Sequence, residues 1–168
     1  MVALLQENTQ PIPMNRQQLM GIQTPGATLS WSPLAHHELL EKVEDRLIGH
    51  GMRIHNTRHS TSHDNNRYFG TVELCSEQGR DYRRMVGIRN SHDKRFSASI
   101  IAGARIICCA NGMFVGSLLC LARKHTSRLH EDLDQRLDES FDRLLQEWER
   151  NDRRINMYKE RLINNMEA

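Results

Sequence analysis

The sequence predicts an α+β fold in which an N-terminal helix is followed by an antiparallel β-meander and a long C-terminal amphipathic helix. Apolar residues recur with helical spacing over 33–49, brief strand-like runs with short connections occupy 52–109, and apolar residues recur every seven positions over 129–166. Short connections favour antiparallel pairing, because parallel strands need a crossover of a dozen or more residues. We therefore expect an extended arm (1–31), an α+β core domain (32–128) and a long helix (129–168), with one hydrophobic core.

The first two segments differ in their periodicity. Residues 1–31 contain three of the four prolines and show no sustained pattern, so we expect an extended arm that lies along the domain or along a neighbouring subunit. A helix is predicted over 33–49, with Ser32 as a candidate N-cap, Pro33 at the first helical position, and Gly49 or Gly51 at its end. His36 and His37 are expected to be exposed on its first turn.

The meander is predicted to contain four or five short strands, which we place at 52–55, 68–74, 84–88, 96–101 and 105–109. Ala102-Gly103-Ala104 suits a tight hairpin between the last two strands. Asn111-Gly112 supplies turn chemistry, and we expect a short helix over 114–123 to follow it.

The C-terminal helix carries a heptad pattern of apolar residues. The residues that form it, and that we expect to make an oligomer contact, include Phe141, Trp148, Ile155, Tyr158 and Leu162. Thirty-eight residues at a rise of about 1.5 Å each span roughly 57 Å, which exceeds the width of a small domain. The distal half then bends back over the sheet, pairs with another subunit or frays.

Composition restricts the class of protein. No run approaches the roughly 18 to 20 apolar residues of a membrane span, and the N-terminus lacks the pattern of a secretory signal. The four cysteines form no Cys-x-x-Cys pair, which favours reduced thiols. We therefore expect a cytoplasmic protein of a bacterial host, with no membrane association.

Charge is distributed unevenly along the chain. Residues 50–128 hold 13 Lys and Arg against 5 Asp and Glu, a net charge of +8, whereas residues 129–168 carry 7 against 11, a net charge of −4. A basic centre favours binding of a polyanion, and the acidic tail then competes with that ligand or meets another basic surface. Scattered charges on a solvated surface are the alternative.

Two polar clusters, Arg89–Lys94 and Arg123–Thr126, flank an apolar strand-forming segment, and folding is expected to bring both to one edge of the sheet. Arginine binds phosphate in a bidentate manner, lysine adds a point charge, and Asp93 caps the turn or orients His92. The candidate anion-binding residues, which include one further strand arginine, are Arg89, Asn90, Ser91, His92, Lys94, Arg105, Arg123, Lys124 and His125.

Catalysis and metal binding are less favoured by the same residues. Neighbouring residues of a strand point to opposite faces, so Ser91-His92-Asp93 is not expected to act as a catalytic triad. The nine histidines match no zinc-binding spacing. We expect no enzyme, no cofactor and no metal, although an approach of His92 to His125 would keep an enzymatic interpretation open.

Three motifs resemble a phage- and plasmid-borne family of unknown function, the domain numbered nine hundred and thirty-two. They are Val86-Gly87-Ile88-Arg89-Asn90-Ser91-His92-Asp93-Lys94, Gly103-x-Arg105-Ile106-Ile107-Cys108-Cys109-Ala110-Asn111-Gly112-Met113-Phe114-x-Gly116 and Arg123-Lys124-His125-Thr126. The resemblance covers about residues 35–135 and implies an origin in a mobile element. The predicted architecture is also similar to that of Rad52-like single-strand annealing proteins, an analogy of fold alone.

These observations favour a phage or mobile-element nucleic-acid-binding protein, of a single-stranded DNA-binding or annealing type used in recombination, that forms a homo-oligomer. Aromatic side chains are scarce in the basic centre, so electrostatics would dominate the binding. The alternative is a protein-interaction or assembly module, such as an inhibitor of a host protein, in which the heptad helix makes the contact.

Overall fold

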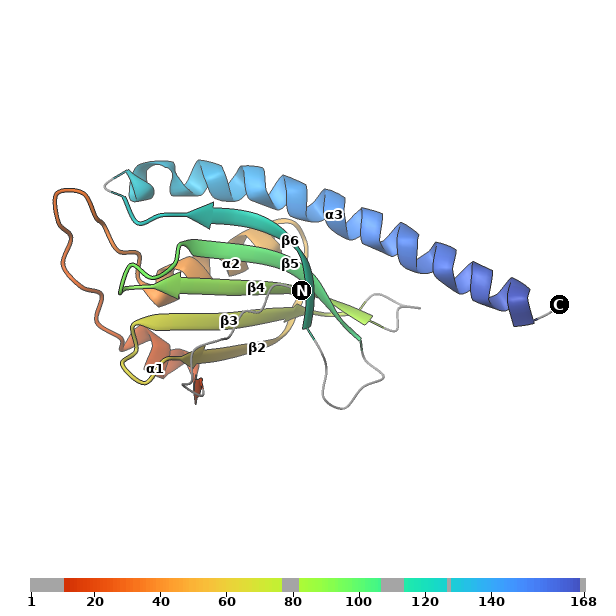
Figure 1. The fold of residues 1–168 in the computed structure, drawn as a ribbon, viewed down its shortest axis with the longest axis horizontal. Helices are drawn as coiled ribbons and strands as arrows, with labels where there is room; N and C mark the ends of the chain where they lie inside the picture. The colour runs from red at the N-terminus through yellow and green to blue at the C-terminus, as the bar shows by residue number, and fades with distance from the viewer. Residues whose placement is uncertain (1–10, 77–81, 107–113, 127, 167–168) are drawn as a thin grey trace.

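The computed structural model describes residues 11–76, 82–106, 114–126 and 128–166, and only the backbone over 104–106, 114–120 and 159–166. Its centre is a six-stranded antiparallel sheet in which each strand pairs with the next along the chain (Figure 1). The α+β meander is thus confirmed, with one strand more than the sequence predicts. The strands are β1 (Ile12–Met14), β2 (Ile54–Thr61), β3 (Arg67–Leu74), β4 (Tyr82–Ser91), β5 (Ala98–Ile106) and β6 (Phe114–Arg123).

Two helices cover one face of this sheet. Helix α2 (His36–Gly49) packs on β2, β3 and β4, and α3 (Leu129–Met166) packs on β5, β6 and α2. In Figure 1, α2 lies behind the sheet and α3 runs along β6 before it extends beyond it. The core between them includes Leu40 and Leu47 of α2, Val86 of β4, Ile100 of β5 and Phe141 of α3. No described helix covers the opposite face, which we call the open face.

The described part of the first segment lies along its own domain, which is one of the two arrangements expected for it. Strand β1 adds to the edge of the sheet through Ile12↔Thr61 and Met14↔His59. Pro13 fits this position because an edge strand tolerates the loss of a backbone donor. Helix α1 (Arg16–Met20) follows, starts with a capping box at Asn15 and buries Leu19. Short elements of this kind have too few residues to show a period.

Helix α2 begins later than the sequence predicts. Its N-cap is Ala35, with no side-chain capping bond, and Ser32 instead donates its backbone N–H to the carbonyl oxygen of His125 at 3.2 Å. Its end is as predicted, since Gly51 has a φ of 75° that a side chain would disfavour. His36 is buried with 1% of its surface exposed, so the expectation of an exposed histidine is wrong.

The predicted hairpin at 102–104 is wrong, because these residues lie inside β5. The indole Nε1 of Trp148 donates to the carbonyl oxygen of Gly103 at 3.2 Å, and the register with β6 shifts between Ala102 and Gly103. The small residues here therefore allow a close approach of α3 and an irregular register with β6. They do not form a turn. The Asn111-Gly112 turn lies outside the described residues.

The predicted short helix over 114–123 is a strand, β6, which pairs with β5 from Arg105↔Phe114 to Ala98↔Arg123. A short apolar run has no period that distinguishes a strand from a buried helix. Pairing along β5 therefore decided its conformation.

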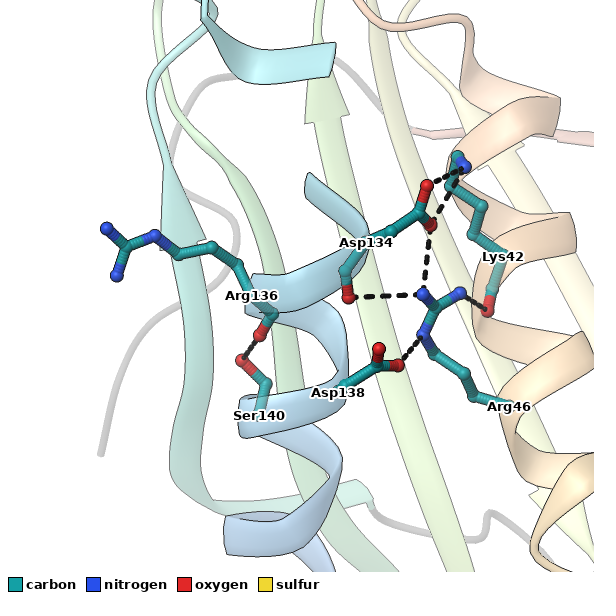
Figure 2. Close-up of polar contacts among 6 residues, drawn as sticks. All are labelled: Lys42, Arg46, Asp134, Arg136, Asp138 and Ser140. Atoms are coloured by element: carbon teal, nitrogen blue, oxygen red, sulfur yellow. Dashed lines mark hydrogen bonds and ion pairs between the residues drawn. The ribbon is translucent and has the colours of Figure 1, made fainter. Parts of the chain in front are cut away.

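Ion pairs join α3 to α2 at the surface (Figure 2). Lys42 Nζ lies 3.0 Å from both carboxylate oxygens of Asp134, and Arg46 donates to Asp134 at 2.9 Å and to Asp138 at 2.8 Å. The carboxylates are more than half exposed, which limits the contribution of each pair to about 1 kcal/mol or less. Their main effect is to fix the orientation of the two helices.

The long helix has two parts with different surroundings. Phe141 and Trp148 have 0% and 2% of their surface exposed because they pack in the core, so their assignment to an oligomer contact is wrong. Ile155 is half-buried and Tyr158 is 58% exposed beyond the sheet, while the side chain of Leu162 is not described. None of the helices in the described ranges is both long and apolar enough to cross a bilayer.

Candidate nucleic-acid interface

The two predicted clusters lie at the same end of the sheet. Strand β4 ends at Ser91 and β6 ends at Arg123, and the start of β5 lies between them through the pairs Arg89↔Ser99 and Ala98↔Arg123. This arrangement follows from the meander, because alternate strands of an antiparallel sheet run in the same direction.

The polar side chains of these clusters converge on the backbone of Leu34. The amide of Asn90 donates to the Leu34 carbonyl oxygen at 2.7 Å, and His92 Nε2 donates to the same oxygen at 2.9 Å. The backbone N–H of Leu34 donates to His125 Nδ1 at 3.1 Å. His92 and His125 therefore hold one peptide segment from two strand ends.

A third histidine, His36, completes this group and was missed as a site residue by sequence reasoning. Its ring stacks on His92 with a centroid distance of 3.8 Å, accepts from Asn90 at 3.0 Å and donates to the Asn65 carbonyl oxygen at 3.1 Å. Its position at the start of α2, two residues after Leu34, is the sequence signal for this role. We call His36, Asn90, His92 and His125 the histidine cluster.

Burial keeps the histidine cluster uncharged. Loss of solvent, followed by repulsion from His92, lowers the pKa of His36 to about 3 and that of His125 to about 4. Burial also lowers the pKa of His92. Asn90, His92 and His125 are buried and bonded to the backbone of Leu34, so the structure gives them a structural role, and their binding of an anion stays a prediction.

Ser91 and Asp93 have a local structural role. Ser91 is buried and donates to Asp93, which also accepts from Arg67 at 2.7 Å and from the backbone N–H of Arg95 at 3.1 Å. Asp93 therefore caps the turn after β4, one of the two expected roles. The Ser91 hydroxyl is thus used within the protein, and its binding of an anion stays a prediction.

The cations of the two clusters have different surroundings. Lys94 Nζ lies 4.7 Å from the centre of the Trp31 ring, and Arg123 forms an ion pair with Asp132 of α3. Lys124 is exposed. Arg105 lies opposite Arg83 in β5, where only the backbone is described.

Arg89 points to a different part of the molecule, the open face of the sheet. Its guanidinium lies 5.2 Å from the centre of the Phe96 ring, and its Nε donates to Ser99 at 3.3 Å. Phe96 in turn contacts Phe69 of β3 with a centroid distance of 5.5 Å. Two rings and a guanidinium therefore form a partly exposed platform.

A groove adjoins this platform on the open face. It has a volume of about 360 Å³, and its lining includes Arg58, Phe69, Thr71, Gly87 and Arg89. Among the described residues neither Arg58 nor Arg89 has an ion-pair partner, and none of the groove's described lining is acidic. Alternation along the strands is the sequence signal that could have grouped these residues, because it places Arg58, Phe69 and Arg89 on one face of the sheet.

Within the described ranges, no group of three or more His, Cys, Asp or Glu side chains could hold a metal ion. Four of the six ring nitrogens in the histidine cluster are bonded, to Leu34, Asn65 and Asn90, so no three of them are left to bind one metal ion.

No protein-family model, curated protein or solved structure matches this chain. The resemblance to the phage- and plasmid-borne family therefore stays a prediction that depends on the three motifs alone.

Proposed function

We propose that the protein binds single-stranded nucleic acid, with single-stranded DNA favoured, on the open face of its sheet. The observation that carries this proposal is the combination, around one groove, of partly exposed aromatic rings and two guanidinium groups, those of Arg58 and Arg89, that form no ion pair within the described residues. Proteins that bind single strands combine cations for the phosphates with rings on which bases stack. A mobile-element role in recombination accords with such an activity.

The arrangement of the acidic residues of α3 also supports the open face as the binding surface. Asp132, Asp134, Asp138 and Asp152 of α3 form ion pairs with cations of their own domain. The acidic tail therefore meets the basic surface of the same chain. The open face lies on the other side of the sheet from α3, so these carboxylates are kept away from it.

Fluorescence anisotropy of labelled single and double strands across a salt series tests the proposal. We expect the single strand to bind at low salt, with an affinity that falls as salt rises by a slope of about −0.7 per neutralised phosphate. Arg58→Ala should weaken binding and lower that slope by about 1. Arg143→Ala removes the same charge from the exposed surface of α3 and should change neither. Absence of binding at low salt would contradict the proposal.

A second candidate function is assembly through the part of α3 that extends beyond the sheet. Met157 and Tyr158 have 55% and 58% of their surface exposed there, and Ile155 continues the seven-residue spacing of Phe141 and Trp148. A heptad seam that is not covered by its own domain is suited to pairing with a second helix. This candidate is compatible with nucleic-acid binding, because it uses a separate surface.

A further inference from the structure

We propose that the groove of the open face holds one unpaired nucleobase of the bound strand, while Arg58 and Arg89 contact the phosphates on either side of it. This inference rests on the proposed function and names the part of the ligand that the groove recognises. A surface that only attracts charge would need no groove.

The groove arises from the register of the strands. Arg58, Thr71, Gly87 and Ile101 lie opposite one another across β2 to β5. Because Gly87 has no side chain, it leaves a hollow between Thr71 and Ile101. All four residues line the groove, and its volume of about 360 Å³ falls at the lower end of the range of about 300–1,000 Å³ for small-molecule sites.

The next row of the same face supplies a ring and a cation. Ser60, Phe69 and Arg89 lie opposite one another across β2, β3 and β4, and all three also line the groove. Phe69 is partly exposed and offers a surface on which a base can stack, a contact worth about 1–3 kcal/mol per base. Arg89 is held by Phe96 and Ser99, which fixes its guanidinium beside the hollow.

The positions of the two arginines suit a strand that crosses the sheet. Arg58 lies on β2 and Arg89 on β4, so their backbones are two strand spacings apart, roughly 10 Å. Both side chains are long enough to reach phosphates that flank a base between them.

The charges near the groove favour an anionic ligand over an apolar peptide. In the neighbouring row the carboxylate of Glu73 bonds to Arg83 at 2.9 Å and is thereby neutralised. With no acidic residue in the described lining, a ligand with negative charge on both sides of a flat apolar group has the complementary pattern. An unpaired base within a strand has this pattern, whereas a duplex keeps its bases paired and stacked.

The experiment compares two labelled DNA strands of equal length and charge. One is oligodeoxythymidylate, and in the other every base is replaced by hydrogen on a tetrahydrofuran sugar. Anisotropy titrations with the full chain at one salt concentration should give a dissociation constant about 10-fold or more higher for the strand without bases. Equal affinities for the two strands would overturn the inference and leave the proposed function standing. Failure of both strands to bind at low salt would overturn the proposed function itself.

A substitution that fills the groove tests its location. Thr71→Trp should weaken binding of oligodeoxythymidylate by a similar factor and leave the affinity for the strand without bases unchanged. Gln146→Trp adds the same side chain on the exposed surface of α3 and should leave both affinities unchanged. Equal weakening of both strands by Thr71→Trp, in a protein whose circular dichroism matches that of the wild type, would overturn the placement. Should Thr71→Trp fail to fold, the comparison of the two strands on the wild-type chain still decides.

Discussion

Leu34 is the residue around which the polar clusters of this protein are organised. Its carbonyl oxygen accepts from Asn90 and His92, and its N–H donates to His125. A buried backbone group without a partner would cost about 1–3 kcal/mol, and the segment before α2 has no strand neighbour to supply one. Side chains of the histidine cluster therefore supply the hydrogen bonds that a neighbouring strand would otherwise give to the Leu34 backbone.

This role makes stability depend on pH. In the unfolded chain a histidine has a pKa of about 6.5, whereas the pKa is about 3 for His36 and about 4 for His125 in the folded protein. The folded state binds fewer protons between these values, so the free energy of unfolding decreases as the pH falls below about 6.5. From about pH 7 to about pH 5 we expect a loss of about 2 kcal/mol for each of these two histidines.

Urea unfolding at the two pH values measures this loss. The nearby ionisable groups are His37, His130 and Asp93, and carboxylates with a lowered pKa, such as Asp93, stay charged in this interval. His125→Gln should reduce the pH dependence, whereas His63→Gln, at an exposed turn, should retain it. A free energy of unfolding that is equal at both pH values would contradict the burial of neutral histidines.

Gly70 is required by the ring of Tyr68. A Cβ at Gly70 would meet the phenol of Tyr68, which is fully buried and hydrogen-bonded through its hydroxyl to His59 Nδ1 at 3.0 Å. The ring cannot move without losing this bond, so Gly70→Ala should lower the free energy of unfolding by about 1–3 kcal/mol. Gly26→Ala is the matched control, because a Cβ there meets nothing within 4 Å, and urea unfolding should show little change. Equal stabilities of the two variants would contradict this contact.

The elements of the fold show which signals a sequence carries. Helices α2 and α3 have clear periods, and both were predicted within a few residues of their ends. Ala102 and Gly103 resemble a turn by composition, but their small size serves the approach of Trp148, a contact that depends on residues 45 positions away in the chain. The same limit applies to the site, because the meander predicted that the clusters meet, but only the fold shows that Leu34 lies between them.

The two parts of α3 should respond differently to substitution. Trp148 is buried and donates to the Gly103 carbonyl oxygen, and the centre of its ring lies 5.3 Å from the guanidinium carbon of Arg84. Trp148→Ala should therefore lower the free energy of unfolding by about 3–5 kcal/mol. Tyr158→Ala, at a side chain that is 58% exposed, should change it by less than about 0.5 kcal/mol. Unfolding in urea measures both, and a Trp148→Ala variant as stable as the wild type would show that α3 does not pack on the sheet in solution.

Charge is segregated on the scale of the whole molecule. Carboxylates in the first part of α3 pair with Lys42, Arg46, Arg84 and Arg123, whereas the described lining of the groove on the open face contains arginines and no acidic residue. The net charge of +2 therefore understates the potential of that face. Among the described side chains of α3 beyond Asp152, those of 153–158, none forms an ion pair with the sheet domain, and we propose this far part of the helix as the surface at which a second copy of the chain pairs.

Pairing of two copies through residues 153–166 predicts a particle heavier than the single chain of 19.6 kDa. Tyr158 continues the heptad seam, so Tyr158→Lys places a charge in the contact, where its desolvation opposes association. Asn156→Lys adds the same charge to an exposed position outside the seam. In sedimentation equilibrium we expect the wild type and Asn156→Lys to associate and Tyr158→Lys to sediment as a single chain. A wild-type protein that sediments at 19.6 kDa would show that this part of the helix serves another partner or none, and would leave the open face as the functional surface of a monomer.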